Sequence, residues 1–306
     1  MKTIYSKKHY LRNSLTEISG GQLVKPFESP ERIEFILNEI SQRKLGSVFE
    51  PTNQNLDIVY KVHDKNYINF LETAWADWVK EGFLGEAIPT VWPSRSMNSK
   101  IIPNNIEGKL GYYCLANETS ISQGTIEAAY EAVRVVLTAV EMLKEGNQRF
   151  LEKNEQDRDL HVQVSETSDG QFPYAVVLSC IDSRVPVELV FDQGVGDIFS
   201  ARVAGNIINE DILGSIEYAC GVAGSKAILV LGHTKCGAVT SACKGVELGN
   251  ITALLSKVKP AIANVQERDG NVEVEEVTKA NVHQSIKEIR EKSSILADLE
   301  RDGKIN

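Results

Sequence analysis

Residues 174–184 read Tyr-Ala-Val-Val-Leu-Ser-Cys-Ile-Asp-Ser-Arg, and this stretch decides the fold of the second half of the chain. Its first part, 174–179, is a short apolar run, as expected for a strand that is buried on both faces. Two similar runs follow at 197–203 and 227–231, and between them residues 209–222 have the apolar spacing of a helix. Short buried strands that alternate with helices predict an α/β fold with a parallel β-sheet flanked by helices.

Residues with metal-binding chemistry follow two of these predicted strands. Cys180, Asp182 and Arg184 come directly after the first strand, and His233 and Cys236 come after the third. Functional groups gather at the carboxyl ends of strands in open parallel sheets. Two thiolates and one imidazole suit zinc and leave its fourth position open, which is typical of a catalytic zinc site. Asp182 either accepts a hydrogen bond from a zinc-bound hydroxide or fills that position itself, and Arg184 is placed to hold it through a bidentate pair.

The pattern Cys-x-Asp-x-Arg followed by His-x-x-Cys resembles the signature of β-class carbonic anhydrases. The flanking stretches that match are 143–150 (Leu-Lys-Glu-Gly-Asn-Gln-Arg-Phe), 202–206 (Arg-Val-Ala-Gly-Asn) and 232–239 (Gly-His-Thr-Lys-Cys-Gly-Ala-Val). The resemblance covers about residues 135–306. It implies a zinc lyase, with one Zn²⁺ per subunit, that reversibly hydrates carbon dioxide to bicarbonate and a proton by means of zinc-bound hydroxide.

The same resemblance implies a role for individual residues. The implied metal ligands are Cys180, His233 and Cys236, with Asp182 as an alternative fourth ligand; the implied catalytic pair is Asp182 and Arg184; and the implied substrate-binding residues are Gln171, Phe199, Ala204 and Gly237. Val177 stands where the bicarbonate-regulated subgroup carries a tryptophan, which favours the unregulated, open-site kind. The family builds its site at a dimer interface, so the resemblance implies a homodimer or homotetramer in which Gln171 serves the neighbouring subunit.

Residues 1–130 resemble a different family, the bacterial acetylpolyamine amidohydrolases of the histone-deacetylase superfamily. The matching stretches are His9–Asn13, Gly20–Glu28, Val62–Asp64, Tyr67–Trp75, Gly111–Cys114 and Glu118-Thr119. That family holds zinc with Asp-x-His motifs and uses tandem histidines. The five histidines of this chain, His9, His63, His161, His233 and His283, form neither pattern. We therefore expect a loop-rich partial α/β segment, like the start of a deacetylase fold, without deacetylase activity.

The two resemblances predict a fusion of two segments with a junction near residues 125–142. The predicted domains are 1–130, deacetylase-like and without catalytic motifs, and 131–306, a β-carbonic anhydrase domain that lacks its last strand. Helical spacing is also expected at 30–43, 65–80, 125–154 and 282–301, with Gly146 ending or bending the third of these helices. Residues 155–172 are polar and predict a loop.

The composition of the chain argues against several classes of function. A net charge of −9 argues against nucleic-acid and anionic-membrane partners, and no run of 18 apolar residues predicts a transmembrane helix. Five cysteines, an odd number, and an N-terminus unlike a signal peptide favour a reducing cytoplasm. Three alternatives stay open: Cys180 and Cys236 as buried structural thiols, a non-catalytic zinc- or bicarbonate-binding protein, and an acetylpolyamine amidohydrolase.

Overall fold

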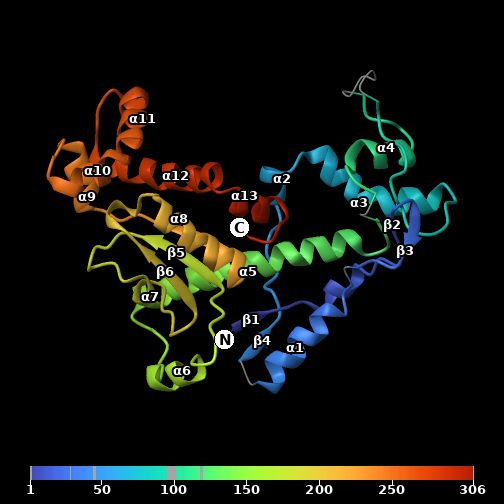
Figure 1. The fold of residues 1–306 in the computed structure, drawn as a ribbon, viewed down its shortest axis with the longest axis horizontal. Helices are drawn as coiled ribbons and strands as arrows, with labels where there is room; N and C mark the ends of the chain where they lie inside the picture. The colour runs from blue at the N-terminus through green and yellow to red at the C-terminus, as the bar shows by residue number, and fades with distance from the viewer. Residues whose placement is uncertain (1, 28, 44–45, 95–100, 118–119, 306) are drawn as a thin grey trace. The chain divides into compact units, whose positions relative to one another are not determined.

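The computed structural model describes residues 2–27, 29–43, 46–94, 101–117 and 120–305 (Figure 1). Glu28 and Glu118-Thr119, which belong to the amidohydrolase resemblance, lie outside the described residues. The chain divides into two compact units. The C-terminal unit contains Val136–Asn306 with the short segments Met1–Ile4 and Gly46–Phe49, and the N-terminal unit contains Tyr5–Leu45 and Glu50–Val135.

A three-stranded sheet forms the centre of the C-terminal unit. Its strands are β5 (Ala175–Ser179), β6 (Ile198–Arg202) and β7 (Ala227–Leu231), in the order β6-β5-β7. Both pairs are parallel, and Val177 of the central strand is aligned with Ser200 and Leu229. This confirms the parallel α/β fold that the three apolar runs predict.

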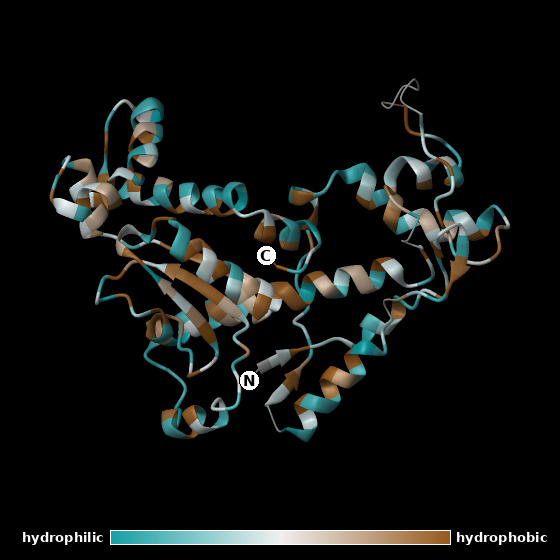
Figure 2. Ribbon diagram, viewed as in Figure 1, coloured by the Kyte–Doolittle hydropathy of each residue, from teal (hydrophilic) through white to brown (hydrophobic). Residues whose placement is uncertain are grey.

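The central strand is buried on both faces because helices cover each side of the sheet. Val176 and Leu178 point into a core built with α8 (Glu210–Glu217), α12 (Val274–Lys292) and α13 (Ser294–Arg301). Ala175 and Val177 point to the opposite core, to which α5 (Thr125–Glu152) and α7 (Val187–Val190) contribute. The hydropathy colouring shows these strands as largely apolar (Figure 2). Burial on both faces explains why β5 reads as a continuous apolar run rather than as an alternating one.

Two predictions for the C-terminal unit are wrong. The predicted loop at 155–172 contains a helix, α6 (Leu160–Glu166), because the Asp159 carboxylate accepts hydrogen bonds from the first free N–H groups, at 3.0 Å each. The predicted helix 282–301 is two helices, α12 and α13. They meet at Ser293, whose extended backbone interrupts the helix and whose hydroxyl accepts a hydrogen bond from Leu296 N–H.

Gly146 does not end α5, because the helix continues to Glu152. A Cβ atom at this position would lie 1.8 Å from the carbonyl oxygen of Phe191. The absence of a side chain at Gly146 therefore allows the helix to lie directly against a neighbouring loop. The remaining helices of the unit are α9 (Gly237–Cys243), α10 (Gly249–Ser256) and α11 (Lys259–Asp269), and Lys2–Ile4 (β1) pairs in parallel with Ser47–Phe49 (β4).

The N-terminal unit has a small core of its own. It contains a hairpin of β2 (Glu17–Ser19) and β3 (Gln22–Val24) and the helices α1 (Arg32–Gln42), α2 (Val59–Val62), α3 (Lys65–Lys80) and α4 (Ile106–Tyr113). Its largest cluster of buried apolar residues joins α3 to α4 and includes Phe70, Trp78 and Leu110. Phe27, Leu84 and Leu115 are each more than nine-tenths exposed, so the unit leaves substantial apolar surface uncovered. Within the described ranges, no helix has both the length and the apolar character that crossing a membrane requires.

Candidate metal centre

Three of the predicted ligands converge at the carboxyl ends of the strands. Cys180 follows β5 directly, and His233 and Cys236 lie in the turn between β7 and α9. Their ligand atoms all lie within 4.8 Å of one another, and the two sulfur atoms are 3.9 Å apart. In the described part of the chain this is the only group of three or more such side chains close enough to share an ion.

The imidazole of His233 is oriented as a metal ligand requires. Its Nδ1 lies 2.9 Å from the carbonyl oxygen of Thr234, so Nδ1 carries the proton and donates it to that oxygen. Nε2 then presents its lone pair to the two sulfur atoms. Nε2 is buried and has no hydrogen-bond partner among the described residues. A buried acceptor left in this way beside two thiols fits a metal ion well.

The two cysteines supply the charge that a metal cation needs. The sulfur atoms of Cys180 and Cys236 share a hydrogen bond, and this interaction lowers the pKa of Cys180. The Gly205 N–H also points at the Cys180 sulfur, at 3.3 Å, and stabilises the thiolate further. Both side chains are almost fully buried, at 4% and 1% exposed. A buried thiolate of this kind is the form that binds a soft or borderline metal.

Asp182 is held by Arg184 beside this group. The Nε and Nη2 atoms of Arg184 donate to the two carboxylate oxygens, and the Arg184 backbone N–H donates to one of them at 3.0 Å. These hydrogen bonds keep the pKa of Asp182 well below its usual range. Oδ2 of Asp182 lies 3.9 Å from Nε2 of His233, which is too far for a hydrogen bond. The carboxylate is therefore ionised, next to the candidate ligands, and engaged with the arginine.

Arg202, to which the sequence motifs assign no role, stabilises the loop that carries Cys180 and Asp182. It is the last residue of β6 and is aligned with Ser179 at the end of β5. Its guanidinium donates to the carbonyl oxygens of Cys180, at 2.9 Å, and Asp182, at 2.7 Å. Two signals for Arg202 were available in the sequence: its place near the end of a predicted strand, and its membership of the matching stretch 202–206.

The four predicted substrate-binding residues lie in two places. Ala204 belongs to a short turn, η2 (Ala204–Asn206), whose Gly205 touches the Cys180 sulfur, and Gly237 follows Cys236 at the start of α9. Phe199 lies near the amino end of β6, half-buried against the core on one face of the sheet. Gln171 is exposed in the loop before β5. Because five strand residues span about 17 Å, a single chain does not bring Gln171 to its own Cys180.

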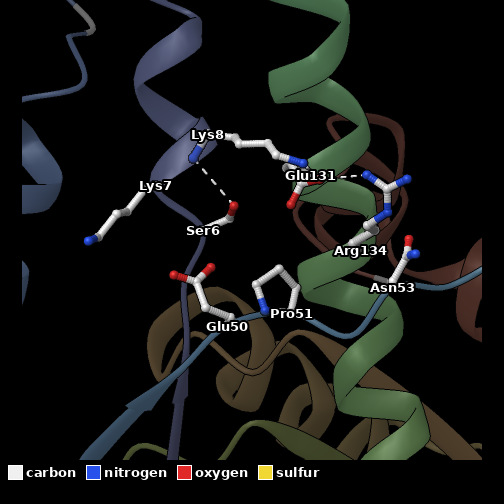
Figure 3. A pocket seen from close by; sticks show the side chains of 8 residues that line it. All are labelled: Ser6, Lys7, Lys8, Glu50, Pro51, Asn53, Glu131 and Arg134. Atoms are coloured by element: carbon white, nitrogen blue, oxygen red, sulfur yellow. Dashed lines mark hydrogen bonds and ion pairs between the residues drawn. The ribbon is translucent and has the colours of Figure 1, made fainter.

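A separate pocket of about 460 Å³ lies in the N-terminal unit (Figure 3). The buried carboxylate of Glu131 accepts hydrogen bonds in its wall from Lys8 Nζ, at 2.9 Å, and from Arg134 Nη1, at 2.5 Å. The other lining residues are Ser6, Lys7, Glu50, Pro51 and Asn53. The two cations thus neutralise the buried carboxylate within the wall.

Known proteins of two different families match the two halves of this chain, in agreement with its two compact units. The profile of the carbonic anhydrase family matches residues 175–306. Carbonic anhydrase 2 of Mycobacterium tuberculosis is 37% identical over 168 residues, which cover 53% of this chain and 81% of that protein. The solved structure of the β-carbonic anhydrase CcaA matches 54% of this chain and 79% of its own, with 25% identity and a TM-score of 0.45.

The chain belongs to the carbonic anhydrase family. Its N-terminal half is similar to a second group: acetylpolyamine amidohydrolase of Mycoplana ramosa is 45% identical over 147 residues, which cover 48% of this chain and 43% of that enzyme. The chain therefore spans less than half of the amidohydrolase that it matches. Both resemblances found in the sequence are confirmed.

Proposed function

We propose that this chain catalyses the zinc-dependent, reversible hydration of carbon dioxide to bicarbonate and a proton. The observation that carries this proposal is the group formed by Cys180, His233 and Cys236, with the unpartnered Nε2 of His233 facing two thiols. Zn²⁺ prefers such a donor set, and three protein ligands leave one position open. When bound, the ion supplies the Lewis acidity that makes water nucleophilic near neutral pH.

The chain's own residues orient the water and bind the substrate. Asp182, held ionised by Arg184, accepts a hydrogen bond from the attacking water and so orients it for carbon dioxide. Arg184 keeps that carboxylate turned away from the ion, which preserves the open position. Ala204, beside the Gly205 that bonds to the Cys180 sulfur, and Gly237, beside Cys236, are proposed to bind substrate, with the backbone N–H of Gly237 at the start of α9 donating to a substrate oxygen.

Gln171 and Phe199 are proposed to bind substrate at the metal centre of a second subunit. Since Gln171 lies at the opposite end of β5 from Cys180, it can hold substrate oxygen only at the metal centre of a neighbouring copy. We therefore include a homodimer or homotetramer, and a cytoplasmic setting that keeps the thiols reduced. Residues 1–130 are proposed as a separate segment without hydrolase chemistry.

Stopped-flow hydration of carbon dioxide by the purified, zinc-loaded chain tests the proposal. The expected result is turnover that disappears on removal of the metal and returns when Zn²⁺ is added back. A folded, zinc-loaded chain that hydrates carbon dioxide no faster than buffer would refute catalysis. If that inactive chain were also monomeric by light scattering, a non-catalytic zinc- or bicarbonate-binding protein would be the better description.

A further inference from the structure

Helix α12 presents two buried polar side chains to the turn η2. Asn281 and Ser285 are 2% and 3% exposed and, four residues apart, share one face of the helix. Asn281 Nδ2 donates to the carbonyl oxygen of Gly205 at 2.8 Å, and Ser285 Oγ donates to that of Asn206 at 2.9 Å. Two successive carbonyl groups of the turn are therefore held from the same helix.

The turn needs such support because its backbone is unusual. Gly205 and Asn206 have φ values of 71° and 43°, in the left-handed region that non-glycine residues seldom adopt. Glycine adopts this region freely and asparagine more readily than most residues, so both positions are permissive and contacts from outside the turn must hold one conformation. The two hydrogen bonds from α12 are buried, so loosening the turn would leave polar groups without partners.

This turn also touches the metal centre. The Gly205 N–H that points at the Cys180 sulfur is fixed by the same backbone conformation that α12 stabilises. A hydrogen bond to a thiolate favours its charged form and withdraws electron density from the sulfur. The strength of the Cys180 ligand therefore depends on how firmly the turn is held.

We infer that Asn281 and Ser285 are positioning residues for the metal centre: they keep the Gly205 N–H on the Cys180 sulfur and so set the affinity and electronic character of that ligand. This inference rests on the proposed function in one respect, that Cys180 binds the metal. Among the described residues, the hydrogen bonds of both side chains go to the backbone of η2 and not to a predicted ligand, so both act through that backbone.

Two variants of the full chain test this inference. Asn281→Leu removes the donor while keeping the number and branching of the side-chain heavy atoms, and Ser285→Ala removes one hydroxyl. The matched control is Ser225→Ala, which deletes a fully buried hydroxyl that donates to Pro173 O at 2.7 Å, at the amino ends of the strands. Zinc affinity is measured by competition with a chromophoric chelator, and the thiolate-to-metal charge-transfer band is measured after Co²⁺ loading.

We expect Asn281→Leu to weaken zinc binding by about 10- to 100-fold, the usual range for partners that orient a ligand. The Co²⁺ charge-transfer band should move to lower energy, because a thiolate without its hydrogen bond gives up electron density more easily. Ser285→Ala should move both readouts in the same direction by a smaller amount, and Ser225→Ala should move neither. The band position reports the sulfur itself, so a general loss of stability would not produce this pattern.

Unchanged affinity and band position in a folded Asn281→Leu chain, judged by far-ultraviolet circular dichroism, would overturn the inference while the proposed function stood. If Asn281→Leu does not fold, Ser285→Ala decides: a shifted band supports the inference and an unchanged band overturns it. A wild-type chain that binds neither Zn²⁺ nor Co²⁺ would instead refute the proposed function, and the inference with it.

Discussion

Arg184 and Asp182 lie side by side, with Nε and Nη2 of the arginine each 2.8 Å from a different carboxylate oxygen. Only one residue separates them in the sequence, and the Arg184 backbone N–H closes the turn by bonding to the same carboxylate. The carboxylate thus has three donors on one side and His233 on the other, so its direction depends on the arginine.

The first prediction follows from that geometry. Arg184→Ala should release Asp182 toward the metal centre and lower kcat/KM for carbon dioxide hydration by about 100-fold, the scale of loss when a reacting group is displaced by about 1 Å. Zinc content should not fall, because Cys180, His233 and Cys236 are untouched. Stopped-flow kinetics and metal analysis of the same sample measure both quantities.

The control for this variant is Arg290→Ala. Arg290 is exposed to a similar extent and also forms a two-point ion pair, but it lies on α12 and its partner among the described residues is Glu300, outside the metal centre. Its loss should leave the kinetics unchanged. Equal losses of activity in both variants would show that the Arg184 effect comes from surface charge and not from orientation of Asp182.

The second prediction concerns the metal itself. Cys236→Ser should abolish stoichiometric zinc binding, because a serine hydroxyl does not ionise near neutral pH and is a poor ligand for Zn²⁺. Cys243→Ser is the matched control, since Cys243 packs against the same apolar cluster as Cys236 but lies outside the ligand group. Metal analysis after dialysis measures both. Zinc retained by Cys236→Ser would mean that the ion binds elsewhere.

Hydrolysis of acetylated polyamines should be absent from the same preparations. If hydrolysis were found and survived Cys236→Ser, the N-terminal unit would contain a hydrolase site of its own, and the amidohydrolase alternative would be revived.

The sequence predicted the strands, and the residues that it proposed as metal ligands lie together in the structure, for a common physical reason. Buried parallel strands are short apolar runs, and ligands of one ion must be residues with metal-binding side chains at fixed spacings. The break at Ser293 and the helix at Leu160 depended on capping by single hydroxyl and carboxylate groups in polar stretches, and such stretches resemble ordinary helix or loop sequence.

Asn281 shows a second limit of sequence reading. A polar residue on a helix normally faces solvent, and its burial against Gly205 depends on contacts between residues 76 positions apart. Gln171 shows the opposite: the strand predicted at 174–179 already separates it from Cys180, and β5 confirms that separation. For Asn281 the decisive information is the tertiary arrangement.

The third prediction is a pH dependence of stability centred on Asp192. Burial alone would raise the pKa of this carboxyl, but hydrogen bonds from Arg158 and Arg149 outweigh burial and hold the pKa below its usual value. A depressed native pKa gives stability that is fully present above the unfolded pKa, about 3.9, and is lost as pH falls through the native value. The free energy of unfolding should therefore decline as acid protonates Asp192.

Asp192→Asn should remove this acid-linked contribution and destabilise the chain by roughly 3 kcal/mol or more at pH 7, because both arginines lose a buried partner. Asparagine suits the site sterically, since residue 192 has φ of 46° and asparagine tolerates the left-handed region. Asp298→Asn, in an exposed pair with Arg301, should cost at most about 1 kcal/mol. Urea unfolding at several pH values compares them; identical pH profiles for wild type and Asp192→Asn would contradict the prediction.

The fourth prediction contrasts two helical glycines. Replacing glycine by alanine inside a helix usually stabilises it by about 1 kcal/mol. Gly214→Ala in α8 should show that gain, because the position is exposed and a Cβ there meets no heavy atom within 4 Å. Gly146→Ala in α5 should do the opposite, since its Cβ would lie 1.8 Å from Phe191 O and 2.9 Å from Gln193 Nε2.

Relief of that overlap requires α5 to move away from the loop that follows α7, where Asp192 is bound by Arg149 of the same helix. Overpacking of this kind costs about 1–3 kcal/mol, which exceeds the helical gain. Chemical denaturation of the two variants should therefore give shifts of opposite sign. A stabilised Gly146→Ala chain would mean that α5 and the 191–193 loop are not in close contact, and that Gly146 serves helix geometry alone.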